Sequence, residues 1–269
     1  MEKNIQLGDA ILKVGFEGEI LSDTANLIKY ENDTSLFELR PALAVKPKSA
    51  EDIKKLVALV ADKKDSNPTI SLTARAAGTG MAGGALNDSI IIDVANLNQI
   101  KSVTAESAVV EPGVFYRDMD AETRKLGAIM PSFPASRNLC AVGGMVGTNA
   151  SGEMTLTYGS TENWVKRLKV ILSDGNEYEF GPLSPAELEK KKKLKGFEGE
   201  IYRRMHELLE KDYDIIKRAK PKVAKNSTGY ALWNVWDKKT FDLTKLFTGS
   251  EGTLGIFTEI EFALIRPKE

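Results

Sequence analysis

The stretch with the clearest chemical signature is a glycine-rich loop, Arg75–Ala85, which lies between two short apolar runs. Its glycines are Gly78, Gly80, Gly83 and Gly84. Without a Cβ, a backbone reaches positive φ and its N–H groups can converge on an anion. The arginine at the start of the loop can supply a counter-charge. The loop therefore predicts a cradle for a phosphate group, and a glycine turn without a ligand is the alternative.

Residues 78–83 match the pattern Gly-x-Gly-x-x-Gly, which alone is a weak indication of dinucleotide binding. In a Rossmann unit the last glycine opens a helix, whose N-terminus holds the pyrophosphate. Here a polar turn and a β-branched run, Ser89–Val94, follow the loop, and such a run is typical of a strand. The order of strand, glycine loop and strand therefore argues against a Rossmann unit.

The composition is that of a globular chain without a strong charge bias. Its 269 residues include 37 Lys and Arg against 38 Asp and Glu, for a formal net charge of −1. This balance gives no general attraction to nucleic acid or anionic lipid, so neither partner is expected. The single cysteine, Cys140, excludes an internal disulfide and a thiolate metal cluster, and no metal site is predicted. No apolar run is long enough for a signal peptide or a membrane span, so a cytoplasmic location is expected.

The first part of the chain predicts an N-terminal helical segment over residues 1–40 and a small α/β lobe over residues 41–96. Within the lobe, the strand Thr69–Thr73 delivers the glycine loop. Ser49 and Asp52 form a capping-box pattern for a helix whose apolar residues share one face.

Residues 97–269 predict a second lobe that contains two further glycine clusters. In Gly143–Gly152, small residues permit close backbone approach to a flat or phosphorylated ligand, and tight packing of a helix on a sheet is the alternative. The third cluster, Phe247–Gly255, precedes Ile256–Leu264, which alternates apolar and acidic residues as in an antiparallel strand with one wet face.

Two other patterns in this lobe predict local structure rather than chemistry. The Asp-Gly pair at residues 174–175 predicts a hairpin with a type I′ turn. From Ser184 to Lys220 a charged stretch is expected to be helical, with lysines 190–193 on a solvated face. The only histidine, His206, lies in this stretch, where a packing or surface role is expected rather than catalysis.

Several motifs, taken in order, resemble the FAD-binding domain of the vanillyl-alcohol-oxidase superfamily. They are the glycine loop, Pro131–Pro134, Gly143–Gly152, Tyr158–Gly159, Asn226–Tyr230 and Gly249–Gly255. Their spacing is most similar to the D-lactate dehydrogenase and glycolate oxidase branch, and the resemblance covers residues 40–266. It implies an α+β, two-lobed PCMH-type fold, in which a small α/β lobe joins a larger lobe with a mostly antiparallel sheet flanked by helices. FAD would lie between the lobes.

The resemblance also implies which residues hold the cofactor, with the glycine loop on the pyrophosphate and the later motifs along the rest of the nucleotide. They are Arg75, Ala77, Gly78, Thr79, Gly80, Met81, Ala82, Gly83, Pro131, Ser132, Gly143, Gly144, Asn149, Gly152, Tyr158, Glu251, Gly255 and Ile256. Ala76 and Ala77 replace usual glycines and Ala82 a usual serine, so one hydroxyl contact is lost and weaker affinity is expected. Members that attach FAD covalently often use a histidine in this loop; none is present, so FAD should bind non-covalently.

For activity, the resemblance implies an FAD-dependent oxidoreductase acting on CH–OH donors, with a 2-hydroxy acid such as D-lactate or glycolate as substrate and an unidentified electron acceptor. Oxidation of a hydroxy acid needs a base near the hydroxyl, and the sequence nominates no catalytic residue. Family enzymes carry a further C-terminal substrate domain, which this chain is expected to lack, so the substrate would bind through another domain or a partner subunit. The alternatives are a non-catalytic flavin-binding or electron-transfer subunit of a split complex, and a binder of another nucleotide.

Overall fold

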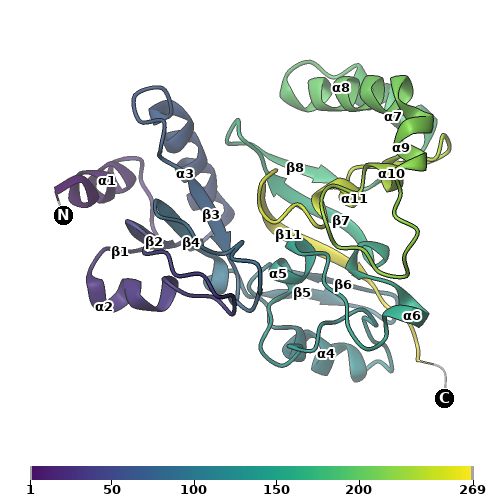
Figure 1. The fold of residues 1–269 in the computed structure, drawn as a ribbon, viewed down its shortest axis with the longest axis horizontal. Coiled ribbons are helices and arrows are strands. Elements are labelled where there is room, and N and C mark those ends of the chain that lie inside the picture. The colour runs from purple at the N-terminus through teal and green to yellow at the C-terminus, as the bar shows by residue number, and fades with distance from the viewer. Residues whose placement is uncertain (1, 268–269) are drawn as a thin grey trace.

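The computed structural model describes the backbone of residues 2–267 and the side chains of residues 7–267, and it shows two lobes side by side (Figure 1). The first lobe holds the N-terminal elements, purple to blue in the figure, and the second holds the teal to yellow elements. One lobe has a largely parallel sheet and the other an antiparallel sheet. The predicted two-lobed α+β fold is therefore confirmed.

The first lobe is built on a four-stranded sheet in the order β1-β2-β4-β3. Strands β2, β4 and β3 run parallel, and β1 is antiparallel to β2. The strands are β1 (Glu19–Leu21), β2 (Leu43–Lys46), β3 (Leu72–Arg75) and β4 (Ile90–Asp93). The helices are α1 (Glu2–Lys13), α2 (Thr24–Leu27) and α3 (Ala50–Lys63), with 3₁₀ turns η1 (Ile28–Tyr30) and η2 (Val94–Asn96). Every residue of β4 is buried, as expected for a parallel strand covered on both faces.

The N-terminal segment and the approach to the glycine loop differ from the prediction. The segment is not only helical, because β1 adds an edge strand to the sheet and residues 31–40 form a loop. The strand before the glycine loop is β3 rather than Thr69–Thr73, since Ile70 still closes a turn by donating to the Asn67 carbonyl. Arg75 is therefore the last residue of a strand and has a fixed backbone.

The capping box predicted for α3 is wrong. Ser49 occupies the N-cap position but its side chain makes no capping hydrogen bond. The Asp52 carboxylate accepts instead from the backbone N–H groups of Glu17 and Lys48, at 2.9 and 2.8 Å. The acid thus ties the N-terminal segment to α3, a tertiary role that a local pattern does not reveal.

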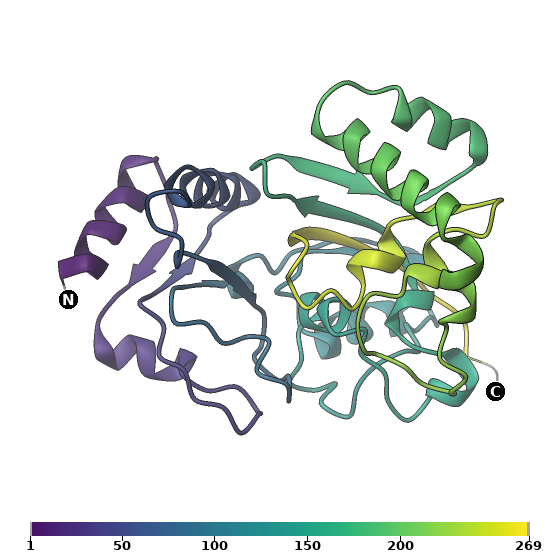
Figure 2. The same cartoon turned by 45° about the horizontal axis from the view of Figure 1, so that its top comes forward.

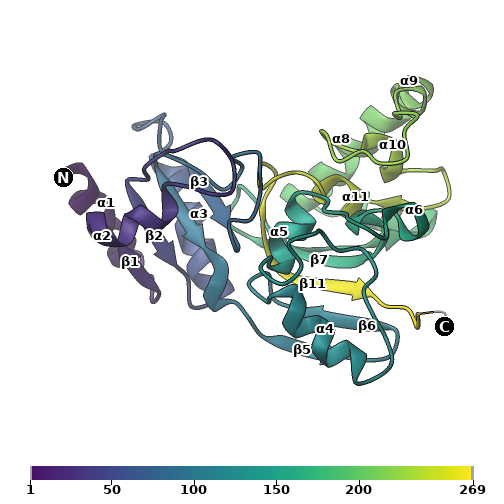
Figure 3. The ribbon, with the colours of Figure 1, turned by 60° about the horizontal axis from the view of Figure 1, so that its bottom comes forward.

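The second lobe is built on a five-stranded antiparallel sheet in the order β5-β6-β11-β7-β8. Strand β11 runs through its centre, between β7 and β6 (Figure 3). The strands are β5 (Ile100–Val103), β6 (Ser107–Val110), β7 (Val165–Ile171), β8 (Glu177–Phe180) and β11 (Ile256–Ala263), with a small pair β9 (Pro182–Leu183) and β10 (Phe241–Asp242). The helices are α4 (Tyr116–Arg124), α5 (Val142–Gly147), α6 (Thr155–Tyr158), η3 (Thr161–Asn163), α7 (Pro185–Lys192), α8 (Phe197–Lys211), α9 (Tyr213–Arg218), α10 (Leu232–Val235) and α11 (Thr244–Phe247).

The predicted hairpin forms between β7 and β8, but its type I′ turn is wrong. Of the loop residues only Gly175 has positive φ, at 77°, and its N–H donates to the Leu172 carbonyl at 2.9 Å. This is a three-residue loop with a left-handed glycine at its end. The tip reaches the first lobe (Figure 2), because a Cβ on Gly175 would lie 3.3 Å from that of Ala58 in α3. The charged stretch after Ser184 is not one helix but three, α7, α8 and α9.

The two lobes share a hydrophobic core through one pair of residues. Ile171 at the end of β7 and Ile256 at the start of β11 are register partners in the second sheet. Both are nevertheless buried in the core of the first lobe, together with residues such as Leu56 and Ile92. Phe257, the next residue, packs into the core of the second lobe. Strand β11 therefore joins the cores and limits how the lobes can move apart.

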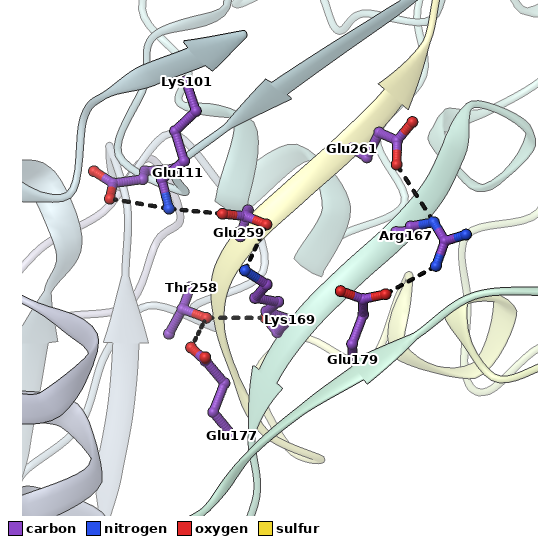
Figure 4. A network of polar contacts seen from close by, with 9 residues as sticks. All are labelled: Lys101, Glu111, Arg167, Lys169, Glu177, Glu179, Thr258, Glu259 and Glu261. Atoms are coloured by element: carbon purple, nitrogen blue, oxygen red, sulfur yellow. Dashed lines mark hydrogen bonds and ion pairs between the residues drawn. The ribbon is translucent and has the colours of Figure 1, made fainter. Parts of the chain in front are cut away.

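The wet face of β11 carries the acidic residues that the alternation predicted, and they form an ion-pair network (Figure 4). Glu259 accepts from Lys101 on β5 and Lys169 on β7, at 2.7 and 2.9 Å. Glu261 lies 3.6 Å from Arg167. Burial pushes the pKa of Glu259 up, but hydrogen bonds from both lysines outweigh it and hold the pKa below its ordinary value. The network thus fastens β11 to its neighbours most strongly when Glu259 is ionised.

This lowered pKa predicts how stability depends on pH. A carboxyl with a lower pKa in the folded state stabilises the fold above its unfolded pKa, about 4.3, and loses that contribution as pH falls through its folded pKa. The wild type should lose unfolding free energy as the pH falls from about 5 to 3, and Glu259→Gln should lose roughly 0.5–1 kcal/mol less over the same range. The difference is modest because the ion pairs are partly exposed. Urea unfolding at several pH values measures it.

The matched control is Glu106→Gln, at an exposed glutamate that forms no ion pair within residues 2–267. It should leave the pH dependence as in the wild type. Identical pH profiles for Glu259→Gln and the wild type would show that the network does not contribute to stability.

Candidate functional site

A cavity of about 410 Å³ lies between the two lobes, and all three glycine clusters line it. The first lobe contributes the loop after β3, and the second contributes α5 with its flanks and the turn before β11. The predicted site residues in its lining are Ala77, Gly78, Thr79, Gly80, Met81, Ala82, Gly143, Gly144, Glu251, Gly255 and Ile256. The fold therefore brings together segments that lie far apart in the chain, as the sequence interpretation requires.

The glycine loop presents an open array of backbone N–H groups. Gly78 and Gly83 have φ of 66° and 77°, values that favour glycine. From Gly78 to Gly84, no backbone N–H donates to a backbone carbonyl in the described part of the chain. A Cβ built on Gly80 would meet nothing within 4 Å, so this residue faces open space. Free N–H groups beside a cavity suit an anion with several oxygen acceptors.

The remaining wall of the cavity is largely apolar and carries little charge. Ala74, Pro112 and Phe257 contribute to it, and Glu251 is the one charged residue in the lining within residues 2–267. Burial raises the pKa of the Cys140 thiol to about 11, so this lining residue stays protonated at neutral pH. An apolar wall joined to an N–H cradle fits a ligand that combines a flat ring system with phosphates.

The other predicted residues do not line the cavity: Arg75, Gly83, Pro131, Ser132, Asn149, Gly152 and Tyr158. Two of them form hydrogen bonds to backbone groups next to the cavity lining. Ser132 Oγ donates to the carbonyls of Ala150 and Gly159, both at 3.3 Å. Asn149 Oδ1 accepts from the Glu162 N–H at 2.9 Å.

Close packing explains two glycines of the second cluster. A Cβ on Gly143 would lie 2.8 Å from the Pro112 carbonyl oxygen, and one on Gly152 would lie 2.3 Å from that of Phe133. Gly143 also borders the cavity, whereas Gly152 does not. Tight packing, left open by the sequence, is therefore part of what this cluster does.

Arg75 has a different environment from the one predicted for a phosphate counter-charge. Its Nη2 donates to the Asn32 carbonyl at 2.7 Å, and its guanidinium lies 5.7 Å from the ring centroid of Tyr30. The residue is 9% exposed, and Nη1 has no hydrogen-bond partner among the described side chains and backbone groups of residues 7–267. Burial lowers the pKa of Arg75, although Asp33 and Asp93 act against this. The guanidinium thus contacts residues of the N-terminal segment, Tyr30 and Asn32, rather than the cavity lining.

Sequence reasoning missed some lining residues. Thr148 lies within the second glycine cluster, and Ser227 within the Asn226–Tyr230 motif, to which no role was given. Ser136 and Cys140 follow the Pro131–Pro134 motif. Their position within or directly after these motifs was the feature of the sequence that could have identified them.

No histidine lines the cavity among the described residues, and the Glu251 carboxylate is the one acidic side chain there. His206 packs against Trp236, with ring centroids 4.8 Å apart, and does not belong to the lining. Among the described side chains of residues 7–267, no group of three or more acidic, histidine or cysteine residues could hold a metal ion. No helix in the described part of the chain has the length and apolarity to cross a membrane. A second cavity, of about 390 Å³, is polar and includes Lys220, Lys225 and Lys245 in its lining.

Comparison with known sequences agrees with this geometry. The profile of a family described as "FAD binding domain" matches residues 41–181. D-2-hydroxyglutarate dehydrogenase of Pseudomonas putida KT2440 is 30% identical over 261 residues, which cover 96% of this chain and 26% of that protein. The protein of that name from Escherichia coli K12 is 33% identical over 258 residues, with 94% and 25% covered. The chain thus spans about a quarter of the length of these relatives.

A more distant relative and two solved structures extend the comparison. The glycolate oxidase subunit GlcD of Bacillus subtilis 168 is 26% identical over 252 residues, which cover 92% of this chain and 42% of that protein. Alkyldihydroxyacetonephosphate synthase matches with a TM-score of 0.64 at 17% identity, covering 98% of this chain and 40% of the other. 6-Hydroxy-D-nicotine oxidase from Arthrobacter nicotinovorans matches with a TM-score of 0.61 at 18% identity, covering 94% and 43%. At such low identity these structures support the fold alone.

The packing of the second glycine cluster makes a testable prediction. In Gly152→Ala the new methyl would meet the Phe133 carbonyl, so we expect the unfolding free energy to fall by about 1–3 kcal/mol. Gly147→Ala is the matched control, because a Cβ there meets nothing within 4 Å and alanine favours the helix. Chemical denaturation without ligand compares the two. Equal stability of both variants would contradict the packing role of Gly152.

Proposed function

The chain belongs to the FAD binding domain family, so FAD is its cofactor, and we propose that the cavity between the lobes is where FAD binds. The observation that carries this proposal is the row of free N–H groups from Gly78 to Gly84 beside an apolar wall. The lobe boundary is proposed near residue 96, with residues 1–40 packed on the first lobe.

In this proposal the residues have two kinds of role. The loop from Ala77 to Ala82 would bind the pyrophosphate through backbone N–H groups, which need no side-chain charge. Gly143, Gly144, Gly255 and Ile256 would contact the rest of the nucleotide from the second lobe. The predicted residues outside the lining would instead hold the wall in place.

Two properties of the lining bear on how tightly and in what form FAD is held. Ala82, in the place of a usual serine, offers no hydroxyl, which supports an affinity below the family norm. The lining includes no histidine among the described residues, and its Cys140 thiol is kept protonated by burial. Both facts support non-covalent attachment.

The activity proposed is that of an FAD-dependent oxidoreductase acting on the CH–OH group of a 2-hydroxy acid, such as D-2-hydroxyglutarate, D-lactate or glycolate. Relatives carry such names, and FAD supplies a two-electron acceptor when bound. The chain's own share is to bind and orient the cofactor and to exclude water from its apolar wall. The base and the substrate contacts would come from another domain or a partner subunit, in a cytoplasmic setting, with the electron acceptor unassigned.

A second candidate function is a flavin-binding or electron-transfer subunit without substrate chemistry of its own. The observation that favours it is the lining of the cavity, which offers one carboxylate and no histidine, lysine or arginine among the described residues. A relative named as an oxidase subunit also supports it.

Filling the cavity should abolish cofactor binding without unfolding the protein. The wild type should yield flavin absorption bands with FAD added and release intact FAD on acid precipitation. In Gly80→Leu the new side chain would project into space that is open in the structure, so we expect the Kd for FAD to rise at least tenfold. Equilibrium titration followed by flavin fluorescence measures it.

The control for this prediction is Ala219→Leu, which places the same side chain at an exposed position outside the lining. It should bind FAD as the wild type does. A wild-type chain that fails to bind added FAD, or a Gly80→Leu variant with unchanged affinity, would contradict the assigned site.

The isolated chain, loaded with FAD, should oxidise hydroxy acids very slowly or not at all, because among the described residues its cavity offers one carboxylate, Glu251, and no histidine, lysine or arginine to bind a hydroxy acid. D-2-Hydroxyglutarate, D-lactate and glycolate would each be tested with an artificial dye as acceptor, and anaerobic bleaching of the flavin bands would follow the reductive step alone. Free FAD is the control. Turnover at ordinary enzymatic rates, with kcat near 10 s⁻¹, would show that the chain contains its own catalytic base.

A further inference from the structure

We propose that the segment Ile28–Leu39 is a clamp that positions the glycine loop for its ligand, with Thr34 and Arg75 as its positioning residues. The inference rests on the proposed site and adds residues outside the cavity to it. It predicts that docking of this segment and binding of FAD stabilise each other.

The first contact of the clamp is a pair of hydrogen bonds to Gly80, at the centre of the glycine loop. Both the N–H and the Oγ1 of Thr34 donate to the Gly80 carbonyl, at 3.2 and 2.7 Å. Every described peptide bond is trans, and in a trans peptide the N–H points opposite to the carbonyl. Holding the Gly80 oxygen on the outer side therefore directs the Met81 N–H the other way. Gly80 and Met81 both line the cavity, so Thr34 sets the direction of a donor in the cradle.

The second contact lies behind the first glycine of the loop. A Cβ on Gly78 would be 2.4 Å from Nη2 of Arg75, so the guanidinium occupies the space directly behind that residue. The same Nη2 donates to the Asn32 carbonyl at 2.7 Å. Arg75 thus joins the loop to the segment, which explains why a loop arginine is buried away from the cavity.

The segment has its own anchors, which a clamp requires. The Leu39 N–H donates to the Glu31 carbonyl at 2.8 Å, which closes the loop. Tyr30 Oη donates to Asp93 at the end of β4, at 2.7 Å. Phe37 packs on the far end of the loop, because a Cβ on Gly83 would lie 2.9 Å from its ring.

The lining explains why such a clamp matters for affinity. Within residues 2–267 the cavity has no lysine or arginine in its lining, so the pyrophosphate would depend on the direction of backbone N–H groups. A cradle fixed before binding loses less conformational entropy when the ligand arrives. By linkage, a ligand that needs the fixed loop must in turn stabilise the segment that fixes it.

Thr34→Val tests the first contact, because valine keeps the shape and the N–H but removes the hydroxyl. We expect about a fivefold increase in the Kd for FAD, the size of one hydrogen bond, with the melting temperature of the ligand-free protein unchanged. The matched control is Thr104→Val, at an exposed threonine outside the clamp and the lining whose hydroxyl donates to the Ser107 carbonyl. It should bind FAD like the wild type. An unchanged Kd in Thr34→Val would overturn the clamp.

Arg75→Lys and Arg75→Met separate positioning from charge. Lysine keeps the positive charge, but its ammonium group cannot both pack behind Gly78 and donate to the Asn32 carbonyl as the planar guanidinium does. The clamp predicts that both variants bind FAD at least fivefold more weakly. Wild-type affinity in Arg75→Lys would overturn the positioning role of Arg75 and assign it a counter-charge role. Thr34→Val keeps the test decisive if an Arg75 variant does not fold.

Hydrogen exchange distinguishes the clamp from a purely structural role, because a structural role alone would not make exchange in this segment depend on FAD. Addition of FAD to the wild type should slow amide exchange across residues 28–39 several-fold, and in Thr34→Val this protection should shrink. Unchanged exchange in the FAD-bound wild type would overturn the coupling. If the wild type binds no FAD, the proposed function itself fails, so the two failures are distinguishable.

Discussion

The structure depends on the burial of one cross-strand pair, Ile171 and Ile256, in the core of the other lobe. These residues belong to the second sheet by hydrogen bonding and to the first lobe by packing. A buried isoleucine contributes roughly 1.5–3 kcal/mol relative to an exposed one, so separating the lobes at this point is costly. The cavity lies beside this contact, with Ile256 in its wall, and the distance between the glycine loop and the second lobe is therefore fixed by packing.

That fixed distance allows the cavity to be built from small residues. Glycines and alanines supply backbone and methyl groups but no long side chains, so the space between the lobes stays open. Close approach elsewhere uses the same residues for another purpose, as at Gly152 against Phe133 and at Gly255 against Val170. Composition alone does not distinguish a glycine that opens space from one that permits contact. Only the position of neighbouring backbone atoms does so.

The sequence predicted the two-lobed α+β fold, the strands next to the glycine loop and the convergence of three glycine clusters, because these follow from local pattern and from the order of motifs. It failed where a distant partner decides. Asp52 accepts from Glu17 as well as from Lys48 beside its own helix, and Arg75 donates to Asn32, while its contact with a phosphate stays a prediction. In each case one partner lies more than thirty residues away in sequence, and no local pattern reveals it. The turn at Gly175 failed for a local reason, since an Asp-Gly pair suits more than one hairpin loop.

The placement of charged side chains bears on which steps this chain can perform, cofactor binding or proton transfer. Ion pairs lie on the wet face of β11, along helices and between loops, whereas the cavity lining holds one carboxylate among apolar and backbone groups within the described part of the chain. A site of this kind can bind and orient a cofactor, since backbone N–H groups supply positive potential without a side chain. Proton abstraction from a hydroxyl needs a base within hydrogen-bond reach, and Glu251 is the one carboxylate that the lining offers among the described residues. This lining supports the proposal that the chain binds the cofactor while another domain or a partner subunit supplies most of the substrate contacts.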